Sequence, residues 1–332
     1  MTDPKQSNGE DFLISRYFRP LATDPGAFGL VDDAAVLQAS GAEIVVTTDA
    51  IVEGVHFLPD DPADTVARKA LRVNLSDLAA KGAVPAGFVL TLALRAADDA
   101  WLAPFARALG EDADLFGCPL LGGDTVSTPG PIMISITAFG RVPPGKMVGR
   151  GGARPGDRIA VTGTIGDAAL GLDILKRGAA AAALVHDAAA SQMLTGRYRV
   201  PRPRSALALA VRDHASAAMD VSDGLAGDLA KLCAASGVSA VIDIKSVPLS
   251  APAATLLARG TVGIEAIVSG GDDYEILCVI PEARFDSFTQ AATLAGVAVA
   301  SIGTVIAGSS APRFLDAQGR ELALKRLSYS HF

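Results

Sequence analysis

Short runs of alternating or β-branched apolar residues along the chain predict the strands of a fold that mixes strands and helices. Six such runs are expected to form strands, and they are Glu43–Thr48, Gly87–Leu94, Ile132–Gly140, Arg158–Thr162, Ala240–Ile244 and Ile276–Ile280. Segments with apolar residues at helical spacing separate them. This order of elements indicates the α/β or α+β class.

The helical periodicity is clearest in Val66–Lys81, where leucines repeat on one side and polar residues form a stripe beside them. The stripe consists of Asn74, Asp77 and Lys81. The same spacing is found in Leu225–Cys233. The alanine-rich tract Ala179–Ala190 is expected to be a peripheral helix without chemistry.

A proline- and glycine-rich stretch near the middle of the chain marks the expected domain boundary. It begins at Val142-Pro143-Pro144-Gly145 and continues into the segment GRGGARPGD, Gly149–Asp157. We therefore expect an N-terminal domain over residues 1–145 and a C-terminal domain over residues 146–332. The two parts contain weakly similar pairs of motifs, LSDLAAKGA followed by LLGGDT in the first and VSDGLAGDL followed by VSGGDD in the second. Asp77 and Asp124 are 47 residues apart, and Asp223 and Asp272 are 49 residues apart. Either an internal duplication or a coincidence of short motifs explains this similarity.

Composition and charge narrow the range of functions. Of the 332 residues, 50% are hydrophobic and 20% are charged, which is typical of a globular protein of one or two domains. The net charge of -7 and the 5% aromatic content argue against nucleic acid as a partner. No apolar run approaches the roughly 18 residues of a membrane span, and the polar N-terminus does not resemble a signal peptide. The three cysteines lie far apart without a CxxC pattern, which favours a reducing compartment, the cytoplasm, over a disulfide framework or a zinc site.

Aspartates recur beside glycine, serine or threonine between apolar runs. The motifs with this texture are VDDAAVL (Asp32, Asp33), VVTTDAIVEGVHF (Thr47, Thr48, Asp49), NLSDLAA (Asp77), LLGGDT (Asp124), MDVSDG (Asp220, Asp223) and SGGDDYE (Asp272, Asp273). Carboxylates at strand ends beside glycine can converge on one cleft, and such oxygen ligands suit magnesium with a phosphate-bearing ligand. Two such charges about 4 Å apart repel by roughly 4 kcal/mol at an effective dielectric of 20, so a converged set would bind divalent ions or take up protons. Taken singly, each aspartate can equally be a helix cap or a turn residue.

The usual phosphate-binding loops are not found, since the sequence contains neither the P-loop pattern nor GxGxxG. Arg150 in the GRGGARPGD segment could reach a phosphate, and VTGTIGDAALGL suggests a strand that leads into a glycine-rich turn and a helix, which favours anions. His56 is the one histidine inside a motif, and it is as readily a surface loop residue. The sequence shows no Ser/His/Asp order and no reactive cysteine setting. An acceptor that is itself a phosphate, with a second pKa of about 6, needs alignment and charge neutralisation rather than a general base.

Taken together, the motifs resemble those of the thiamine-monophosphate kinase family. They are TTDAIVEGVHF, KALRVNLSDLAAKGAVP, LLGGDT, RGGARPGD, VTGTIGDAALGL, MDVSDGLAGDL and SGGDDYE, in family order from about Asp11 to the C-terminal YSHF. The resemblance implies ATP-dependent phosphorylation of thiamine monophosphate to thiamine diphosphate, with several magnesium ions. It also implies the two-domain fold of the aminoimidazole ribonucleotide synthetase superfamily. In that fold the strands of the N-terminal α/β domain pair across a homodimer, and the C-terminal α/β domain closes the active-site cleft.

The same resemblance implies roles for individual residues. Those at the family's metal positions are Asp33, Thr47, Thr48, Asp49, Asp77, Asp124, Asp220 and Asp223. Those at nucleotide contacts are Gly123, Asp124, Arg150 and Ser222, and those at substrate contacts are His56, Asp272 and Arg326. Family members transfer the phosphoryl group directly, without a phospho-enzyme, which agrees with the lack of a nucleophile motif.

Three positions depart from the family pattern and keep other functions open. Val31 replaces a glycine before the first aspartate pair, Asp272 replaces the usual glutamate, and Arg326 stands where an aromatic residue is expected. An ATP-dependent ligase similar to aminoimidazole ribonucleotide synthetase and a nucleotide-binding protein without turnover are therefore the alternatives. Selenophosphate synthetase is a poor match, because that enzyme needs a reactive cysteine or selenocysteine near the N-terminus and the first cysteine here is Cys118. A hydrogenase maturation factor is also a poor match, because it needs a C-terminal cysteine and this sequence ends in SHF. A calcium module is the least favoured, because no EF-hand run is present.

Overall fold

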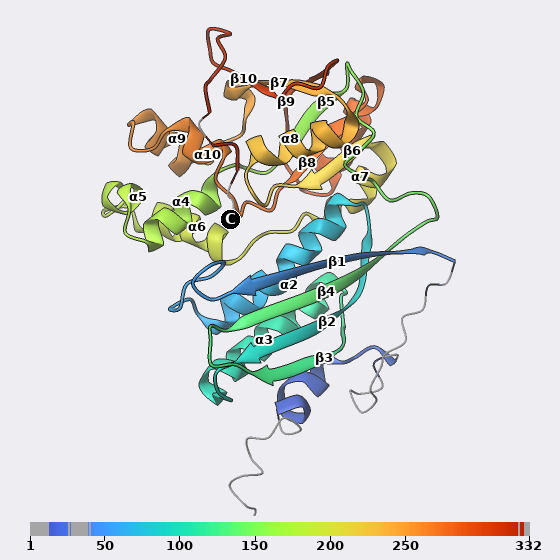
Figure 1. The fold of residues 1–332 in the computed structure, drawn as a ribbon, viewed down its shortest axis with the longest axis vertical. Coiled ribbons are helices and arrows are strands. Elements are labelled where there is room, and N and C mark those ends of the chain that lie inside the picture. The colour runs from blue at the N-terminus through green and yellow to red at the C-terminus, as the bar shows by residue number, and fades with distance from the viewer. Residues whose placement is uncertain (1–12, 26, 28–38, 40, 325, 329–332) are drawn as a thin grey trace, which may run out of the picture. The chain divides into compact units, whose positions relative to one another are not determined.

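A computed structural model describes residues 13–25, 27, 39, 41–324 and 326–328 of the chain. The chain divides into two compact units, shown in Figure 1. The first unit comprises residues 1–78 and 84–145, and the second comprises residues 79–83 and 146–332. Within the described residues, none of the helices combines the length and the apolar character that crossing a bilayer requires.

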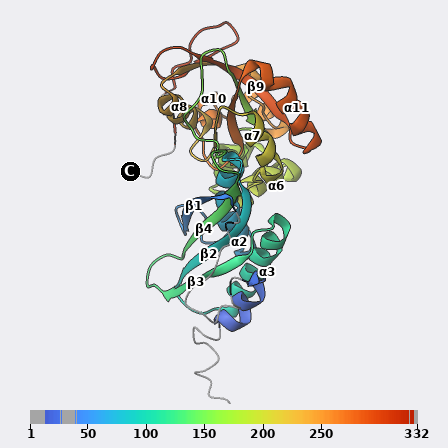
Figure 2. The ribbon, with the colours of Figure 1, turned by 90° about the vertical axis from the view of Figure 1, so that its right-hand side faces the viewer.

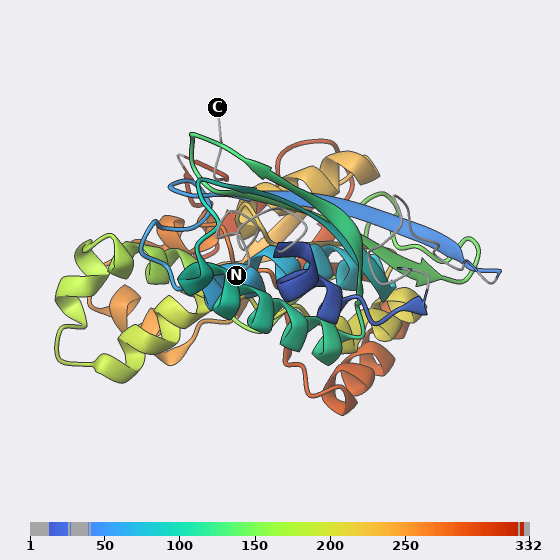
Figure 3. The ribbon, with the colours of Figure 1, turned by 90° about the horizontal axis from the view of Figure 1, so that it is seen from below.

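The first unit is a four-stranded sheet with two long helices. Its elements are η1 (Ile14–Phe18), η2 (Arg19–Leu21), β1 (Glu43–Val52), α2 (Ala63–Ala80), β2 (Val84–Leu94), α3 (Asp99–Phe116), β3 (Leu120–Ser127) and β4 (Met133–Val142). The strand order is β1-β4-β2-β3, and all neighbours are antiparallel except β2 and β3. Since parallel neighbours need a crossover connection, α3 joins β2 to β3. Both α2 and α3 lie on the same side of the sheet (Figures 2 and 3).

The alternation of buried and exposed residues shows which face of this sheet is covered. Along β4, Ile134, Ile136 and Ala138 are buried, and the residues between them are only partly buried. The opposite face carries large apolar side chains that are exposed, and they are Val46, Val84, Val126 and Met133. Among the described residues of the first unit, no helix covers this second face of the sheet.

The second unit is a six-stranded mixed sheet between layers of helices. Its strands are β5 (Arg158–Thr162), β6 (Ala217–Asp220), β7 (Ser239–Asp243), β8 (Ile276–Ile280), β9 (Val299–Ile306) and β10 (Arg313–Leu315), in the order β10-β7-β9-β5-β8-β6. Its longer helices are α4 (Asp167–Leu175), α6 (Ala188–Arg199), α7 (Ala208–His214), α8 (Leu225–Ser236), α9 (Ala251–Ala258) and α11 (Phe285–Leu294). Its shorter ones are α5 (Ala179–Ala183), α10 (Ile264–Val268) and the turns η4 (Ser205–Leu207), η5 (Ile244–Ser246) and η6 (Glu282–Arg284).

The six-stranded sheet is buried on both faces, because every residue of β8 is buried. One face packs against α8 and α10 through a cluster that includes Leu229 and Ile267. The other packs against α7 and α11 through Val211 and Phe288. A separate helical cluster joins α4, α5, α6 and α9. A continuous apolar run such as β8 is the sequence pattern that a strand covered on both faces requires.

The six strands expected from the sequence are all formed, as β1, β2, β4, β5, β7 and β8. The helix expected over Val66–Lys81 is α2. The single helix expected over Ala179–Ala190 was wrong, because the tract breaks into α5 and α6. The cause is Asp187, whose side chain accepts a hydrogen bond from the Ala190 N–H at 3.0 Å and starts a new helix.

Two further expectations need correction. Asp49 and Asp124 lie inside β1 and β3 rather than at strand ends. The echoing motifs also occupy different local structures, since Asp77 lies near the end of α2 whereas Asp223 precedes the start of α8. Asp124 is in a strand and Asp272 in a loop. The similar spacing of the motifs therefore gives no support to an internal duplication.

Candidate active site

The loop between β6 and α8 carries three residues that the sequence singled out. Asp220 ends β6 and is buried, and Ser222 and Asp223 follow it. The carboxylate of buried Asp228 accepts hydrogen bonds from the backbone N–H groups of Ser222, at 3.0 Å, and Asp223, at 2.9 Å. Asp228 thereby fixes the turn that leads into α8, as a capping side chain does at a helix start.

Lys231 supplies a positive charge to this acidic loop. Its Nζ lies 2.6 Å from the carboxylate of Asp223 and 2.9 Å from that of Asp228. Burial raises the pKa of Asp228, and the hydrogen bond from Lys231 opposes that shift. Burial also lowers the pKa of Lys231, but its hydrogen bonds to the two carboxylates outweigh that effect and leave the pKa raised. The ammonium group therefore stays charged beside both carboxylates.

The Ser269–Tyr274 loop lies directly against the β6–α8 loop. The Asp272 N–H donates to the Ser222 carbonyl, and the Tyr274 N–H donates to the Val221 carbonyl, both at 2.8 Å. A Cβ on Gly271 would lie 2.5 Å from the Ser222 carbonyl oxygen, so only glycine permits this approach. The structure thus brings Asp272 together with Ser222, although the two residues lie far apart in the sequence.

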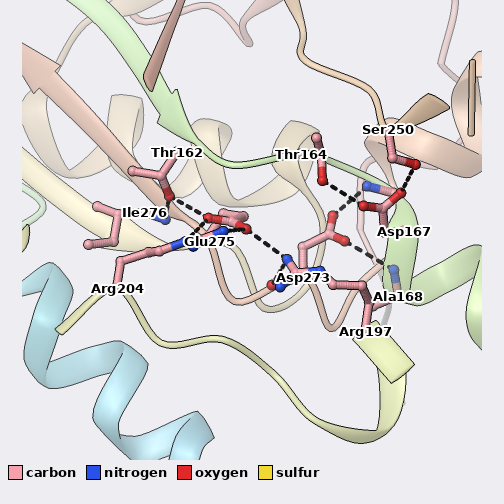
Figure 4. Close-up of polar contacts among 11 residues, drawn as sticks. Thr162, Thr164, Asp167, Ala168, Arg197, Arg204, Ser250, Asp273, Glu275 and Ile276 are labelled. Atoms are coloured by element: carbon pink, nitrogen blue, oxygen red, sulfur yellow. Dashed lines mark hydrogen bonds and ion pairs between the residues drawn. The ribbon is translucent and has the colours of Figure 1, made fainter. Parts of the chain in front are cut away.

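Asp273 occupies the N-terminus of α4. Its side chain is buried and accepts hydrogen bonds from the N–H groups of Gly166, at 2.7 Å, and Ala168, at 3.2 Å (Figure 4). Burial raises the pKa of Asp273 well above its usual range, against the opposing effect of these two hydrogen bonds. The anion-favouring geometry expected for the VTGTIGDAALGL motif is therefore present, and the group bound at that helix terminus is a carboxyl group of the protein itself.

Glu275 is the centre of a buried ion-pair network in the same region. Its carboxylate is fully buried and accepts hydrogen bonds from Arg197, at 2.7 Å, from Arg204, at 2.6 Å, and from the Thr162 hydroxyl, at 2.6 Å (Figure 4). Arg197 comes from α6, Arg204 from the segment before η4, and Thr162 from β5. Glu275 thus connects three segments to the end of the Ser269–Tyr274 loop.

Arg326 and Arg150 are held by their main-chain atoms. The Arg326 carbonyl accepts a hydrogen bond from the Ser269 hydroxyl at 2.7 Å, which places it next to the loop of Asp272. The Arg150 carbonyl accepts from the Ser236 hydroxyl at 2.9 Å. Ser236 is the last residue of α8, whereas Ser222 precedes its first turn. The main chain of Arg150 therefore contacts the C-terminal end of α8, whereas Ser222 precedes the other end of that helix.

In the first unit, β1 and α2 bring a second group of predicted residues together. The Thr47 hydroxyl donates a hydrogen bond to the carboxylate of Asp77. The Asp49 N–H donates to the Asn74 side chain at 3.0 Å, and Asn74 donates in turn to the Ala70 carbonyl at 3.0 Å. Asn74 and Asp77 are three residues apart and share one face of α2. This face holds the strand segment that carries Thr47 and Asp49.

Thr48 and Asp124 lie on the opposite face of the same sheet. Asp124 pairs with Thr91, which pairs with Ser135, which pairs with Ala50. Directly paired residues share a face, and so do residues two apart on a strand, so Ala50, Thr48 and Asp124 point to one side. The structure therefore separates Thr48 and Asp124 from the Thr47–Asp77 pair.

Gly123 and His56 are each fixed by close contacts. A Cβ on Gly123 would lie 1.9 Å from the Leu90 carbonyl oxygen, so glycine is required where β3 meets β2. His56 Nδ1 accepts a hydrogen bond from the Val52 N–H at 3.0 Å. The Nζ of buried Lys69 donates to the His56 carbonyl at 2.8 Å. The Val52 bond assigns the neutral imidazole proton to Nε2.

The structure brings the predicted residues together in two groups, one in each unit. Asp33 and Val31 lie outside the described residues. Among the described residues, no cluster of three or more His, Cys, Asp or Glu side chains is close enough to hold a metal ion. Sequence reasoning also missed the supporting roles of several residues, namely Lys69, Asn74 as a strand anchor, Arg197, Arg204, Asp228 in fixing the turn, Lys231, Asp273 as a helix cap, and Glu275. Most are charged residues next to apolar runs, which is the one sequence signal that could have indicated buried ion pairs.

Comparisons with known proteins agree on the class of protein. The chain matches the N-terminal domain of AIR synthase related proteins over residues 31–142 and the C-terminal domain over residues 154–313. It is 44% identical over 324 residues to a thiamine-monophosphate kinase of Caulobacter vibrioides, and the match covers 96% of this chain and 89% of that protein.

Solved structures give the same result. A thiamine-monophosphate kinase from Stenotrophomonas maltophilia is 36% identical and superposes with a TM-score of 0.82, covering 94% of this chain and 98% of that chain. AaThiL complexed with AMPPCP and TMP is 28% identical with a TM-score of 0.75, covering 100% of this chain and 99% of that chain. The chain belongs to the thiamine-monophosphate kinase family.

Proposed function

We propose that the chain transfers the γ-phosphoryl group of ATP to thiamine monophosphate, forming thiamine diphosphate and ADP. The observation that carries the proposal is the joined pair of loops in the second unit. Backbone hydrogen bonds hold Asp272, at a family substrate position, against Ser222, at a nucleotide position. The relatives named thiamine-monophosphate kinase, and the neighbour complexed with AMPPCP and TMP, support the two ligands, a nucleotide and thiamine monophosphate.

The transfer proceeds directly from ATP to the acceptor phosphate. All three cysteines are buried, and burial raises the pKa of the thiols to about 12 for Cys118, about 11 for Cys233 and about 12 for Cys278. None of these thiols is suited to act as a nucleophile at neutral pH. The phosphate monoester of the acceptor is mostly dianionic there and needs no base to remove a proton. The protein therefore has to align the two phosphates and offset their charge.

Magnesium is the ion that the oxygen donors of both groups fit. Asp49 and Asp77 with the Thr47 hydroxyl in the first unit, and Asp220 with Asp223 in the second, offer hard oxygen ligands in pairs. Pairs suffice, because magnesium in kinases takes one or two carboxylates and completes its shell with phosphate oxygens and water. The ions would neutralise charge on the phosphates during transfer. Thr48, Asp124 and Asp33 are the remaining family metal positions.

The other predicted contacts keep the roles that the family implies. Gly123, Asp124 and Arg150 are proposed to contact the nucleotide, and His56 and Arg326 the thiamine substrate. The hydrogen bond that His56 Nδ1 accepts from Val52 fixes the orientation of the imidazole ring. A variant with His56→Ala should raise the KM for thiamine monophosphate, and an unchanged KM would remove His56 from the substrate site.

A homodimer in the cytoplasm is the assembly that we propose. The exposed valines and methionine on the uncovered sheet face of the first unit form an apolar surface of the kind that pairs between subunits. Sedimentation analysis of the protein and of the variant Val46→Lys tests this assembly, because a lysine there should shift the protein to monomer. A wild-type protein that sediments as a monomer would exclude it. The three cysteines without disulfides suit a reducing compartment.

The first experiment is an assay of ATP consumption with magnesium and three separate acceptors, with products identified by mass spectrometry. The acceptors are thiamine monophosphate, thiamine and formylglycinamidine ribonucleotide. We expect ADP and thiamine diphosphate with the first acceptor only. ATP binding without turnover on any acceptor would contradict the kinase proposal, and turnover with the third would indicate the ligase alternative.

Two substitutions assign roles within this reaction. Asp220→Asn should abolish most turnover at saturating magnesium while leaving the far-UV circular dichroism unchanged, because it removes a metal ligand without changing side-chain shape. Asp213→Asn is the matched control, since Asp213 is exposed and forms its ion pair with the neighbouring Arg212 at the surface. Asp272→Ala should mainly raise the KM for thiamine monophosphate. A normal rate for the first variant, or a normal KM for the last, would contradict the assigned role.

A further inference from the structure

The segment that carries Asp272 adopts an unfavourable backbone conformation. Asp272 has φ 72° and Tyr274 has φ 50°, so two non-glycine residues in the left-handed region flank Asp273. Side chains with a Cβ pay a steric cost in this region, and the cost is larger for tyrosine than for aspartate. Such residues persist only where the surrounding structure holds them.

The first hold on this segment is the side chain of Asp273. Its two oxygens accept hydrogen bonds from the Gly166 and Ala168 N–H groups at the start of α4. The loop also touches α4 directly, because a Cβ on Gly270 would lie 2.4 Å from the Cβ of Ala169. The helix terminus favours the negative charge and fixes its position. Asp273 therefore ties the middle of the strained segment to a rigid element.

The second hold is Glu275, at the end of the segment. Arg197 and Arg204 bind its carboxylate from two sides, and Thr162 binds it from β5 (Figure 4). Between the two holds, the Asp272 and Tyr274 N–H groups bond to the Ser222 and Val221 carbonyls. The backbone on both sides of Asp272 is thus held by the side chains of Asp273 and Glu275 together with these two backbone hydrogen bonds.

We propose that Asp273 is a positioning residue. Its carboxylate, bound at the start of α4, holds the strained segment in the conformation that presents Asp272 to the thiamine substrate and keeps it against Ser222. The substrate part of this inference rests on the proposed kinase function. The conformational part does not, and it can be tested without any substrate.

The decisive variant is Asp273→Asn, with Asp167→Asn as its matched control. Asparagine keeps the shape of Asp273 but turns one acceptor into an NH2 group that faces a backbone donor. Asp167 is equally buried at the same helix start, but its partners are the hydroxyls of Thr164 and Ser250, outside the strained segment. The control therefore perturbs the same region without releasing the loop.

Hydrogen–deuterium exchange on the free protein is the first readout. We expect the peptide that contains residues 269–275 to exchange at least tenfold faster in Asp273→Asn, and at the wild-type rate in Asp167→Asn. A wild-type exchange rate in Asp273→Asn would overturn the proposal. This result holds whether or not the protein is a kinase.

Steady-state kinetics are the second readout. Asp273→Asn should raise the KM for thiamine monophosphate by about tenfold and lower kcat by less than threefold, as expected for one lost charged hydrogen bond. A purely structural role would instead lower the apparent kcat through loss of folded protein, with KM unchanged, and that outcome would overturn the proposal. A wild-type protein without kinase activity would refute the proposed function and leave the exchange result standing.

A second pair of variants removes the dependence on the folding of Asp273→Asn. Tyr274→Gly and Tyr274→Ala both remove the ring, but only glycine adopts φ 50° without a steric cost. If the segment is strained, Tyr274→Gly should melt at least about 2 °C above Tyr274→Ala. Equal melting temperatures, or a lower one for glycine, would show that no strain is held there.

Discussion

Glu275→Gln is the substitution that tests the buried ion-pair network most directly. Glu275 is fully buried and accepts hydrogen bonds from Arg197, Arg204 and Thr162. Glutamine preserves the shape, but it removes the negative charge that both guanidinium groups bind and turns one acceptor into a donor facing them. The unfolded chain loses nothing, because all groups are hydrated there.

The magnitude follows from the burial of the three groups. Breaking one side of a buried ion pair costs about 3–5 kcal/mol. The Arg204 side chain keeps 20% of its surface exposed and can regain some hydration, whereas Arg197 keeps only 6%. We therefore expect the lower end of the range, about 3 kcal/mol. For a unit of this size, that corresponds to a decrease in melting temperature of roughly 6–12 °C.

Urea unfolding followed by far-UV circular dichroism measures this loss. Trp101 lies in the first unit, so its fluorescence reports on that unit separately from the dichroism of the whole chain. Glu282→Gln is the matched control, since Glu282 also binds an arginine, Arg158, through two hydrogen bonds, but on the surface. The control should change the free energy of unfolding very little. A decrease in the free energy of unfolding below about 1 kcal/mol for Glu275→Gln would refute the reasoning, because a decrease of that size is expected of an exposed ion pair.

Three further predictions address packing, pH and thiol chemistry. Gly171→Ala places a Cβ 2.1 Å from the Leu194 carbonyl oxygen and should destabilise the protein by about 1–3 kcal/mol in a urea titration. Gly196→Ala, which has open space in α6, should stabilise the protein slightly in the same titration. Equal effects of the two substitutions would contradict the tight α4–α6 contact. The hydrogen bond from Arg95 lowers the pKa of Glu53 below its ordinary 4.5, against the effect of burial. The stability that Glu53 contributes is therefore present above pH 4.5 and is lost as the pH falls through the folded-state pKa. Glu53→Gln should therefore flatten the acid side of the stability profile, and an unchanged profile would count against the pair. Ellman's reagent should find no rapidly reacting thiol in the native protein and all three cysteines after denaturation, because each is buried with a raised pKa; one fast thiol would contradict this.

The apolar patterns predicted these strands because a strand buried on one face alternates apolar and polar residues, and a strand buried on both faces is apolar throughout. β4 alternates, and β8 is apolar throughout, as their environments require. β3 escaped prediction because its LLGGDT segment combines two glycines with an aspartate, residues that are rare in strands. Gly123 is tolerated there because it allows β2 to approach closely, a requirement set by the partner strand and invisible in the local sequence.

The aspartates were identified as a group, but their division between two faces and two units was not predictable. Thr48 and Thr47 are adjacent in the sequence, yet they point to opposite faces of the sheet, because side chains alternate along a strand. The role of Asp273 was also hidden. It adjoins Asp272 in the same motif, but its carboxylate faces a helix that lies about a hundred residues earlier in the chain, and only the tertiary fold reveals that contact.

The ammonium group of Lys231 also bears on how the protein matures. A loop with three carboxylates would repel itself during folding if its charge had to await divalent cations. Lys231, in α8, places one positive charge next to the carboxylates of Asp223 and Asp228, so the loop closes on a counter-charge encoded in the chain. We therefore expect the second unit to fold in the absence of divalent ions and to remain folded in the presence of a chelator. Under the proposed function, the supply of magnesium would then determine the activity of the protein rather than its folding, the reverse of a zinc finger, which is unfolded without its ion.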